Sequence, residues 1–141
     1  MRGCFKDTDM NDIKEIKEFF EKDRFATKNG MYIEEVGEKY AKCALEITDD
    51  HRNALGALMG GVPYTLADFC FAVATNHEDT PTVSLSSNIT YLSQPKGKTL
   101  FAEAKCEKDG KTTCYYSIKI YDELGVKVAD AVTTGFHIQK K

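Results

Sequence analysis

A single carboxylate and a pair of glycines are the residues of this chain whose types and spacing could do chemistry together. Gly60 and Gly61 precede an apolar stretch that ends near Asn76, and Asp68 is the one acidic residue within it. A carboxylate buried among apolar side chains has a raised pKa and can act as a general base or a nucleophile. Backbone N–H groups at a helix start lack intrahelical partners and can stabilise an oxygen that gains negative charge. Together the two features suit attack on a carbonyl group.

Each of these residues also has a purely structural interpretation. The glycine pair could simply permit a tight turn before the helix. Asp68 could be a structural carboxylate paired with a backbone or tyrosine group. Asn53 could hold a water or a carbonyl through its side-chain amide, or it could be only a turn residue after Asp49 and Asp50. The sequence leaves these alternatives open.

The three histidines do not complete a nucleophilic triad. His51 and His77 fall in expected loops, where we predict them to be solvated, and His137 lies near the end of an expected strand. None has a serine or cysteine partner in the arrangement that a triad needs. The five cysteines have no C-x-x-C pair and no zinc-ligand spacing to the histidines, so we predict free thiols in a reducing compartment. They are Cys4, Cys43, Cys70, Cys106 and Cys114.

Length and composition predict one globular domain over residues 1–141. The net charge of −3 argues against broad nucleic-acid binding, which depends on clustered Lys and Arg. The charged N-terminal residues lack the apolar core of a signal peptide. No apolar run approaches the ~20 residues of a membrane span. We therefore predict a cytoplasmic protein that binds neither nucleic acid nor membrane.

The periodicity of apolar residues predicts an α+β domain. An amphipathic helix is expected at about 9–22, followed by a loop over 23–30 and a long apolar helix at about 61–76. Four strands follow that helix and read as a meander, which packs best if the sheet curves around the helix. The expected strands are 31–36, 40–48, 83–92, 99–107, 112–122 and 127–137, the first two forming a hairpin around Gly37-Glu38.

The central segment resembles the active-site segment of hotdog-fold acyl-CoA thioesterases, and most closely their phenylacetate-pathway (PaaI-like) branch. Residues 83–95 and 98–104 are also similar to that family, and the resemblance runs from about residue 29 to residue 138. The resemblance implies a hotdog fold, in which a curved antiparallel sheet wraps around a long central helix. The motif that carries it is Asn53-x-x-Gly56-x-x-Met59-Gly60-Gly61-x-x-x-x-Leu66-Ala67-Asp68.

The resemblance also implies an activity and a set of site residues. It implies hydrolysis of an acyl- or aryl-CoA, with Asp68 as general base or nucleophile and with Gly61 and Asn53 as further catalytic residues. Substrate-binding residues would be Met59, Gly60 and Ser84, although a strand serine could equally face solvent. No metal and no redox cofactor are expected, and coenzyme A enters as part of the substrate. The family's active site lies at a dimer interface, so a homodimer or a dimer of dimers is expected, with Asp68 facing the partner's Gly61.

One departure from the family pattern motivates a second hypothesis. The family usually carries His-Gly-Gly before the helix, whereas Met59 stands in the first position here. Methionine offers no proton and only a weak acceptor. The chain could therefore be a weakened enzyme or a non-catalytic acyl-CoA binder. A DNA-binding sensor and a dehydratase are less favoured. Lys96 and Lys98 could meet coenzyme A phosphates or could only make the surface more soluble.

Overall fold

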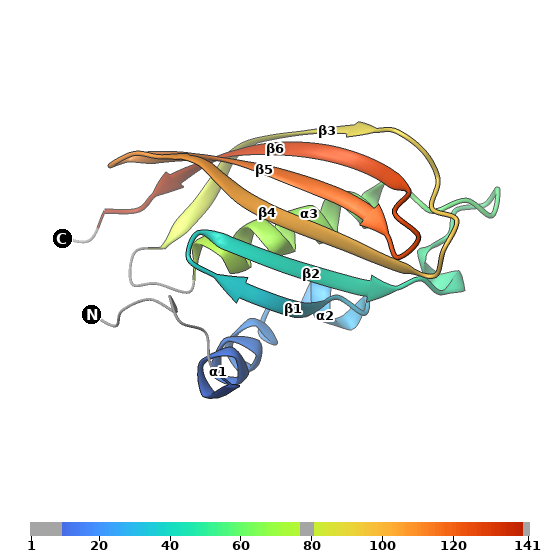
Figure 1. The fold of residues 1–141 in the computed structure, drawn as a ribbon, viewed down its shortest axis with the longest axis horizontal. Coiled ribbons are helices and arrows are strands. Elements are labelled where there is room, and N and C mark those ends of the chain that lie inside the picture. Colours follow the sequence, from blue (N-terminus) through green and yellow to red (C-terminus); the bar gives the residue numbers. More distant parts are fainter. Residues whose placement is uncertain (1–9, 77–80, 140–141) are drawn as a thin grey trace.

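The computed structural model describes residues 10–76 and 81–139 and has the expected α+β architecture. A curved antiparallel sheet wraps around one long helix, α3 (Figure 1). Residue 77 therefore lies outside the described residues, and so does Cys4. The helices are α1 (Met10–Phe20), α2 (Arg24–Lys28) and α3 (Gly61–Thr75), with a short 3-10 turn at Asp49–His51. The strands are β1 (Tyr32–Gly37), β2 (Tyr40–Glu46), β3 (Thr82–Tyr91), β4 (Thr99–Asp109), β5 (Thr113–Asp122) and β6 (Lys127–His137).

The strand order corrects the prediction of a four-strand meander. Within the described residues the sheet runs β1-β2-β4-β5-β6-β3, so β3 pairs with β6 and not with β4. The chain crosses from β3 to β4 through residues 92–98, and β4 pairs with β2 instead. Turn residues between two strands indicate a connection, but they do not specify a tight hairpin. As a result β3 lies at one edge of the sheet and β1 at the other.

Two further boundaries differ from the sequence prediction. Arg24–Lys28 forms the short helix α2, where a loop was expected. In the first hairpin Gly37 pairs directly with Tyr40, so the turn residues are Glu38 and Lys39, and Lys39 adopts a φ of 55°. The expected N-terminal helix is confirmed as α1, whose Phe20 ring packs edge-on against the ring of Phe69 in α3.

Small residues in the sheet allow α3 to approach it closely. Ala41, Ala102 and Ala104 are fully buried, and the Cys70 thiol donates to the carbonyls of Ala41 (3.2 Å) and Ala102 (3.3 Å). Phe71 is buried on the same helix and packs edge-on against Tyr116. A helix this apolar is expected to be buried on all sides, but α3 is not. Gly61, Tyr64 and Asp68 form an exposed stripe, because residues three and four apart share one helix face.

Asp122 fixes the connection that leads from β3 to β4. Its buried carboxylate accepts hydrogen bonds from the backbone N–H groups of Lys96 (2.7 Å), Gly97 (2.9 Å), Leu124 (2.9 Å) and Val126 (2.9 Å). Burial alone would raise the pKa of this carboxyl, but the four backbone donors outweigh it and the pKa is lowered. The connection that carries Gln94 is thereby held against the β5–β6 turn. Among the described residues no helix has the length and apolarity to cross a membrane.

Candidate active site

The loop that leads into α3 is held at both ends by hydrogen bonds. Arg52 forms an isolated antiparallel bridge with Leu58, and the Met59 N–H donates to the His51 carbonyl (3.0 Å). His51 is buried, which corrects the expectation that it is solvated. Its Nδ1 accepts from the Thr48 N–H (2.9 Å), so Nε2 carries the proton and donates to the Asn29 carbonyl (2.7 Å). His51 therefore serves as a neutral structural anchor for this loop.

Asn53 closes the loop through its side-chain oxygen. Oδ1 accepts hydrogen bonds from the N–H groups of Leu55 (2.9 Å) and Ala57 (3.1 Å), which is an Asx turn. The turn interpretation thus accounts for the side-chain oxygen of Asn53 but not for its side-chain nitrogen. The Asn53 side-chain nitrogen makes no hydrogen bond to any described residue, and the residue is exposed. That nitrogen is free to donate to a ligand beside the start of α3.

Tyr91 at the end of β3 and Gln94, three residues later, position the two residues on either side of Met59. The Tyr91 hydroxyl donates to the Gly60 carbonyl (2.8 Å). A Cβ at position 60 would stand only 3.1 Å from the Tyr91 hydroxyl oxygen. The Leu58 N–H donates to the Gln94 side-chain oxygen (2.8 Å). Gly60 therefore has a packing reason to be glycine. Neither Tyr91 nor Gln94 was identified from the sequence, because nothing local links a strand end to a loop some thirty residues earlier.

Gly61 presents an unpaired backbone donor to solvent. It is the first residue of α3 and is exposed, and its N–H makes no hydrogen bond within the part of the chain that the structure describes. Its carbonyl accepts from the Thr65 hydroxyl (2.8 Å). The half-exposed Met59 side chain extends toward this residue, with Cε 3.5 Å from where a Gly61 Cβ would stand. A donor at a helix N-terminus beside a site without a side chain can approach a carbonyl oxygen closely.

Asp68 lies two turns further along the exposed stripe. It is solvent-exposed in the single chain, which corrects the expectation of a carboxylate buried among apolar side chains. Partial burial of its carboxyl nevertheless raises its pKa, and a hydrogen bond from the Ser84 side chain opposes that rise. Burial also raises the pKa of Asp23, which the charge of Asp68 raises further. The structure thus brings Ser84 and Asp23 to Asp68.

Two hollows flank this stripe. The first, about 240 Å³, lies between α2 and α3 beside Asp68, and the second, about 320 Å³, lies beside Gly60 under the end of β3. Asp23, Arg24, Phe25, Ala26, Thr65, Asp68 and Phe69 line the first. Leu58, Gly60, Pro63, Tyr91, Leu92, Ser93, Gln94 and Val128 line the second.

The Gly61 N–H and the Asp68 carboxylate of one chain cannot contact the same small group. They lie seven positions apart on one helix face, which is about 10.5 Å along the axis. A carbonyl bonded to the helix N-terminus would therefore be out of reach of the carboxylate of the same chain. A site that uses both groups needs a second chain running in the opposite direction.

The edge strand β3 adjoins this stripe and is unprotected. Its ten residues carry no charge and include Val83 (45% exposed) and Leu85 (60% exposed). Soluble proteins usually blunt a long edge with charges, proline or a covering segment. β3 therefore leaves a long, uncharged edge of the sheet exposed.

Comparison with known proteins gives one family. The family model described as thioesterase superfamily matches residues 55–129 of this chain. The acyl-coenzyme A thioesterase PaaI of Escherichia coli K12 is 31% identical over 111 residues, which are 78% of this chain and 79% of that protein. A solved structure of the E. coli PaaI protein from the phenylacetic acid degradation operon has a TM-score of 0.84 at 26% identity, covering 92% of this chain and 95% of that one.

Two other similar proteins carry informative names. Human acyl-coenzyme A thioesterase 13 is 35% identical over 89 residues, which are 61% of this chain and 64% of that protein. A Streptococcus mutans UA159 protein whose structure was solved bound to acetyl-CoA has a TM-score of 0.73 at 26% identity, covering 79% of this chain and 91% of that one.

Proposed function

Because this chain belongs to the thioesterase superfamily, and within it to the PaaI-like hotdog thioesterases, we propose that it hydrolyses the thioester of an acyl- or aryl-CoA to the free acid and coenzyme A. Two relatives named above are acyl-CoA thioesterases, and a third protein of similar fold was solved with acetyl-CoA. The observation that carries the proposal is the exposed stripe of α3. It combines the unpaired Gly61 N–H with Asp68, whose pKa is raised.

We propose that two chains share each site. An antiparallel pair of β3 strands would bury the uncharged edge and set two α3 helices side by side in opposite directions. Asp68 of one chain would then lie opposite the Gly61 of the partner subunit. The separation of about 10.5 Å between these groups in one chain supports this arrangement, because it prevents one chain from completing the site. Pairing of two such dimers into a tetramer stays a prediction.

The chemistry follows from the character of each group. The Asp68 carboxylate either takes a proton from a water as the water oxygen bonds to the carbonyl carbon, or attacks that carbon itself. In the second case the acyl group is left on Asp68 as an anhydride, which a water then hydrolyses to the free acid and the restored carboxylate. The Gly61 N–H of the partner subunit stabilises the oxygen that gains charge. The C–S bond then breaks and the sulfur leaves as a thiolate. A thiol has a pKa of about 8.5, so the thiolate leaves with little help from an acid. Met59 at the position of a proton donor is compatible with this step.

The acyl chain has two hollows available. Phe71 is buried in the core and is not available to line a pocket. Phe69 lines the hollow beside Asp68 together with Phe25, and Tyr64 is exposed on the stripe. This lining favours an aryl or a medium-length aliphatic group. Lys96 and Lys98 are exposed and stay candidates for the coenzyme A phosphates. A cytoplasmic location also stays a prediction, supported by the free thiols of Cys43, Cys70, Cys106 and Cys114.

A second candidate function is acyl-CoA binding without turnover. Met59 favours it, because its side chain lies beside the Gly61 donor but supplies no hydrogen bond.

Restoring a histidine at this position separates the two functions. We expect Met59→His to raise kcat/KM on a panel of aryl- and aliphatic-CoAs by about tenfold, because an imidazole N–H beside Gly61 adds a hydrogen bond to the substrate. Release of free coenzyme A by wild type and variant is the measurement. Met59→Leu, which changes shape little and adds no donor, is the matched control and should leave the rate within about threefold. Tight acyl-CoA binding with no product from the wild-type protein over hours would contradict hydrolysis. It would favour the second candidate function, acyl-CoA binding without turnover.

A further inference from the structure

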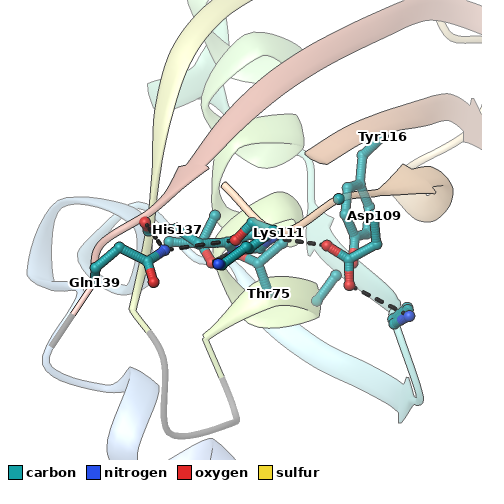
Figure 2. A pocket seen from close by; sticks show the side chains of 10 residues that line it. Thr75, Asp109, Lys111, Tyr116, His137 and Gln139 are labelled. Atoms are coloured by element: carbon teal, nitrogen blue, oxygen red, sulfur yellow. Dashed lines mark hydrogen bonds and ion pairs between the residues drawn. The ribbon is translucent and has the colours of Figure 1, made fainter. Parts of the chain in front are cut away.

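A second cluster of chemically capable side chains lies at the opposite end of α3 from Gly61. Asp109 at the end of β4, Cys114 in β5 and His137 at the end of β6 bring a carboxylate oxygen, a thiol sulfur and an imidazole nitrogen within 4.8 Å of one another. Asp109 and His137 line a cavity of about 250 Å³, in which they face each other (Figure 2), and Cys114 is buried beside them. No part of the proposed hydrolysis uses these residues.

His137 is already oriented as a ligand would be. Its Nε2 lies 2.7 Å from Asp109 Oδ1, and its Nδ1 lies 2.8 Å from the Thr82 hydroxyl oxygen. Thr82 is buried, so its hydroxyl fixes the plane of the ring. Histidines that bind metals commonly use one ring nitrogen for the metal and the other for such a partner. Without a metal, the 2.7 Å contact requires Nε2–H to donate to the Asp109 carboxylate, and the Thr82 hydroxyl contacts Nδ1. A metal bound to Nε2 would displace that proton, and Nδ1–H would then donate to Thr82.

The carboxylate and the thiol are also positioned. Asp109 Oδ2 pairs with Lys39 Nζ at 3.3 Å, which leaves Oδ1 beside His137. Cys114 is buried next to Gly135, and a Cβ at position 135 would stand 2.8 Å from the Cys114 sulfur. Glycine at this position therefore leaves the room that the sulfur occupies. One oxygen, one nitrogen and one sulfur converge from three neighbouring strands.

We propose that Asp109, Cys114 and His137 form a binding site for a divalent metal ion of the zinc type. A thiolate, an imidazole and a carboxylate are the ligand types that zinc takes in proteins, and a thiolate disfavours magnesium and calcium. The ligand atoms would close from their present spread to separations of about 3.5 Å around a tetrahedral ion, with water from the cavity as fourth ligand. The Cys114 thiol loses its proton to water on binding, and the two negative ligands then balance the charge of the ion.

The ion would join the ends of β4, β5 and β6 at the end of the sheet away from the hydrolytic site. This proposal departs from the sequence prediction of no metal. Asp109 and Cys114 are only five positions apart, but His137 follows 23 positions after Cys114, and pairing of β5 with β6 brings it to them. No Cys-to-His spacing in the sequence therefore indicated the site.

Binding of Co²⁺, a spectroscopic substitute for zinc, tests the proposal on the full chain. All proteins carry Cys4→Ser and His77→Gln, so that residues outside the described ranges supply no thiolate or imidazole ligand. We expect near-ultraviolet thiolate-to-cobalt absorption and visible bands of tetrahedral cobalt, both reversed by Zn²⁺. Cys114→Ser should abolish the thiolate band, and His137→Gln and Asp109→Asn should weaken Zn²⁺ binding about 100-fold. Thr82→Val should weaken it about tenfold through His137.

Cys106→Ser is the matched control, because Cys106 lies on β4 near the cluster but outside its three ligand residues. It should leave the cobalt spectrum unchanged. Absence of cobalt bands in the parent protein would overturn the proposal and leave an ordinary Asp109–His137 ion pair. A thiolate band that survives in Cys114→Ser would overturn it equally. If Cys114→Ser fails to fold, the His137→Gln and Asp109→Asn affinities decide, and unchanged values contradict the site.

Discussion

Asp68→Asn is expected to lower kcat/KM for acyl-CoA hydrolysis by about 10³-fold, because positioned proton transfer is worth about 10² to 10⁴ in rate. The amide has the shape of the carboxylate but can neither take a proton from water nor attack the thioester. The Ser84 hydroxyl that bonds Asp68 can also bond an amide oxygen, so the fold and the substrate affinity should change little. Release of free coenzyme A and calorimetry with a non-hydrolysable acyl-CoA analogue measure the two effects separately.

The pH profile gives this prediction a second readout. Partial burial raises the pKa of Asp68. The proposed mechanism requires its carboxylate form. The wild-type rate should therefore fall as pH decreases through that raised pKa, and the residual rate of Asp68→Asn should lack this acidic limb. Asp50→Asn, an exposed carboxylate on the loop before α3, is the control and should behave as wild type. Wild-type activity in Asp68→Asn would show that another group does the chemistry.

Leu85→Glu is expected to dissociate the protein into monomers and to reduce hydrolysis by about 100-fold or more, since it places like charges near each other across a two-fold axis. Leu85 is 60% exposed on the uncharged edge strand β3, where the proposed interface would bury it. Loss of the interface would separate each Asp68 from the Gly61 of the partner subunit. Sedimentation and activity measured at the same protein concentrations test both parts.

Leu124→Glu is the matched control for this variant. Leu124 is exposed to a similar degree, 65%, but lies in the turn between β5 and β6 and not on β3. It should keep the oligomeric state and the activity of the wild type. A Leu85→Glu monomer with full activity would mean that one chain completes the site, which the 10.5 Å estimate of the helix geometry does not allow.

The periodicity of apolar residues and the turn residues predicted most helices and strands, because interactions between residues close in sequence determine them. The helix start at Gly61, with Pro63 in its first turn, and the alternating strands β4 to β6 agree with the sequence to within a few residues. The place of β3 beside β6 could not be predicted, because strand order depends on pairing between distant segments. The helix α2 was missed because five residues give too little periodicity to distinguish a helix from a loop.

In the candidate site, too, the local features were predicted and the contacts between distant segments were not. The types and spacing of Asn53, Gly61 and Asp68 were visible in the sequence, and the structure places all three on the exposed side of one loop and helix. The prediction that His51 is solvated was wrong because its partner, the Asn29 carbonyl, lies 22 residues earlier in the chain. The contacts of Tyr91 and Gln94 likewise depend on the tertiary fold.

The most direct test of a shared site mixes two inactive variants. Asp68→Asn and Gly61→Val chains are unfolded together and refolded, so that about half of the dimers contain one chain of each kind. In such a dimer one site combines both substitutions, and the other combines an intact Asp68 with an intact Gly61. The account predicts recovery of about a quarter of wild-type activity from two inactive parents. No recovery, in a mixture shown to contain the heterodimer, would contradict it.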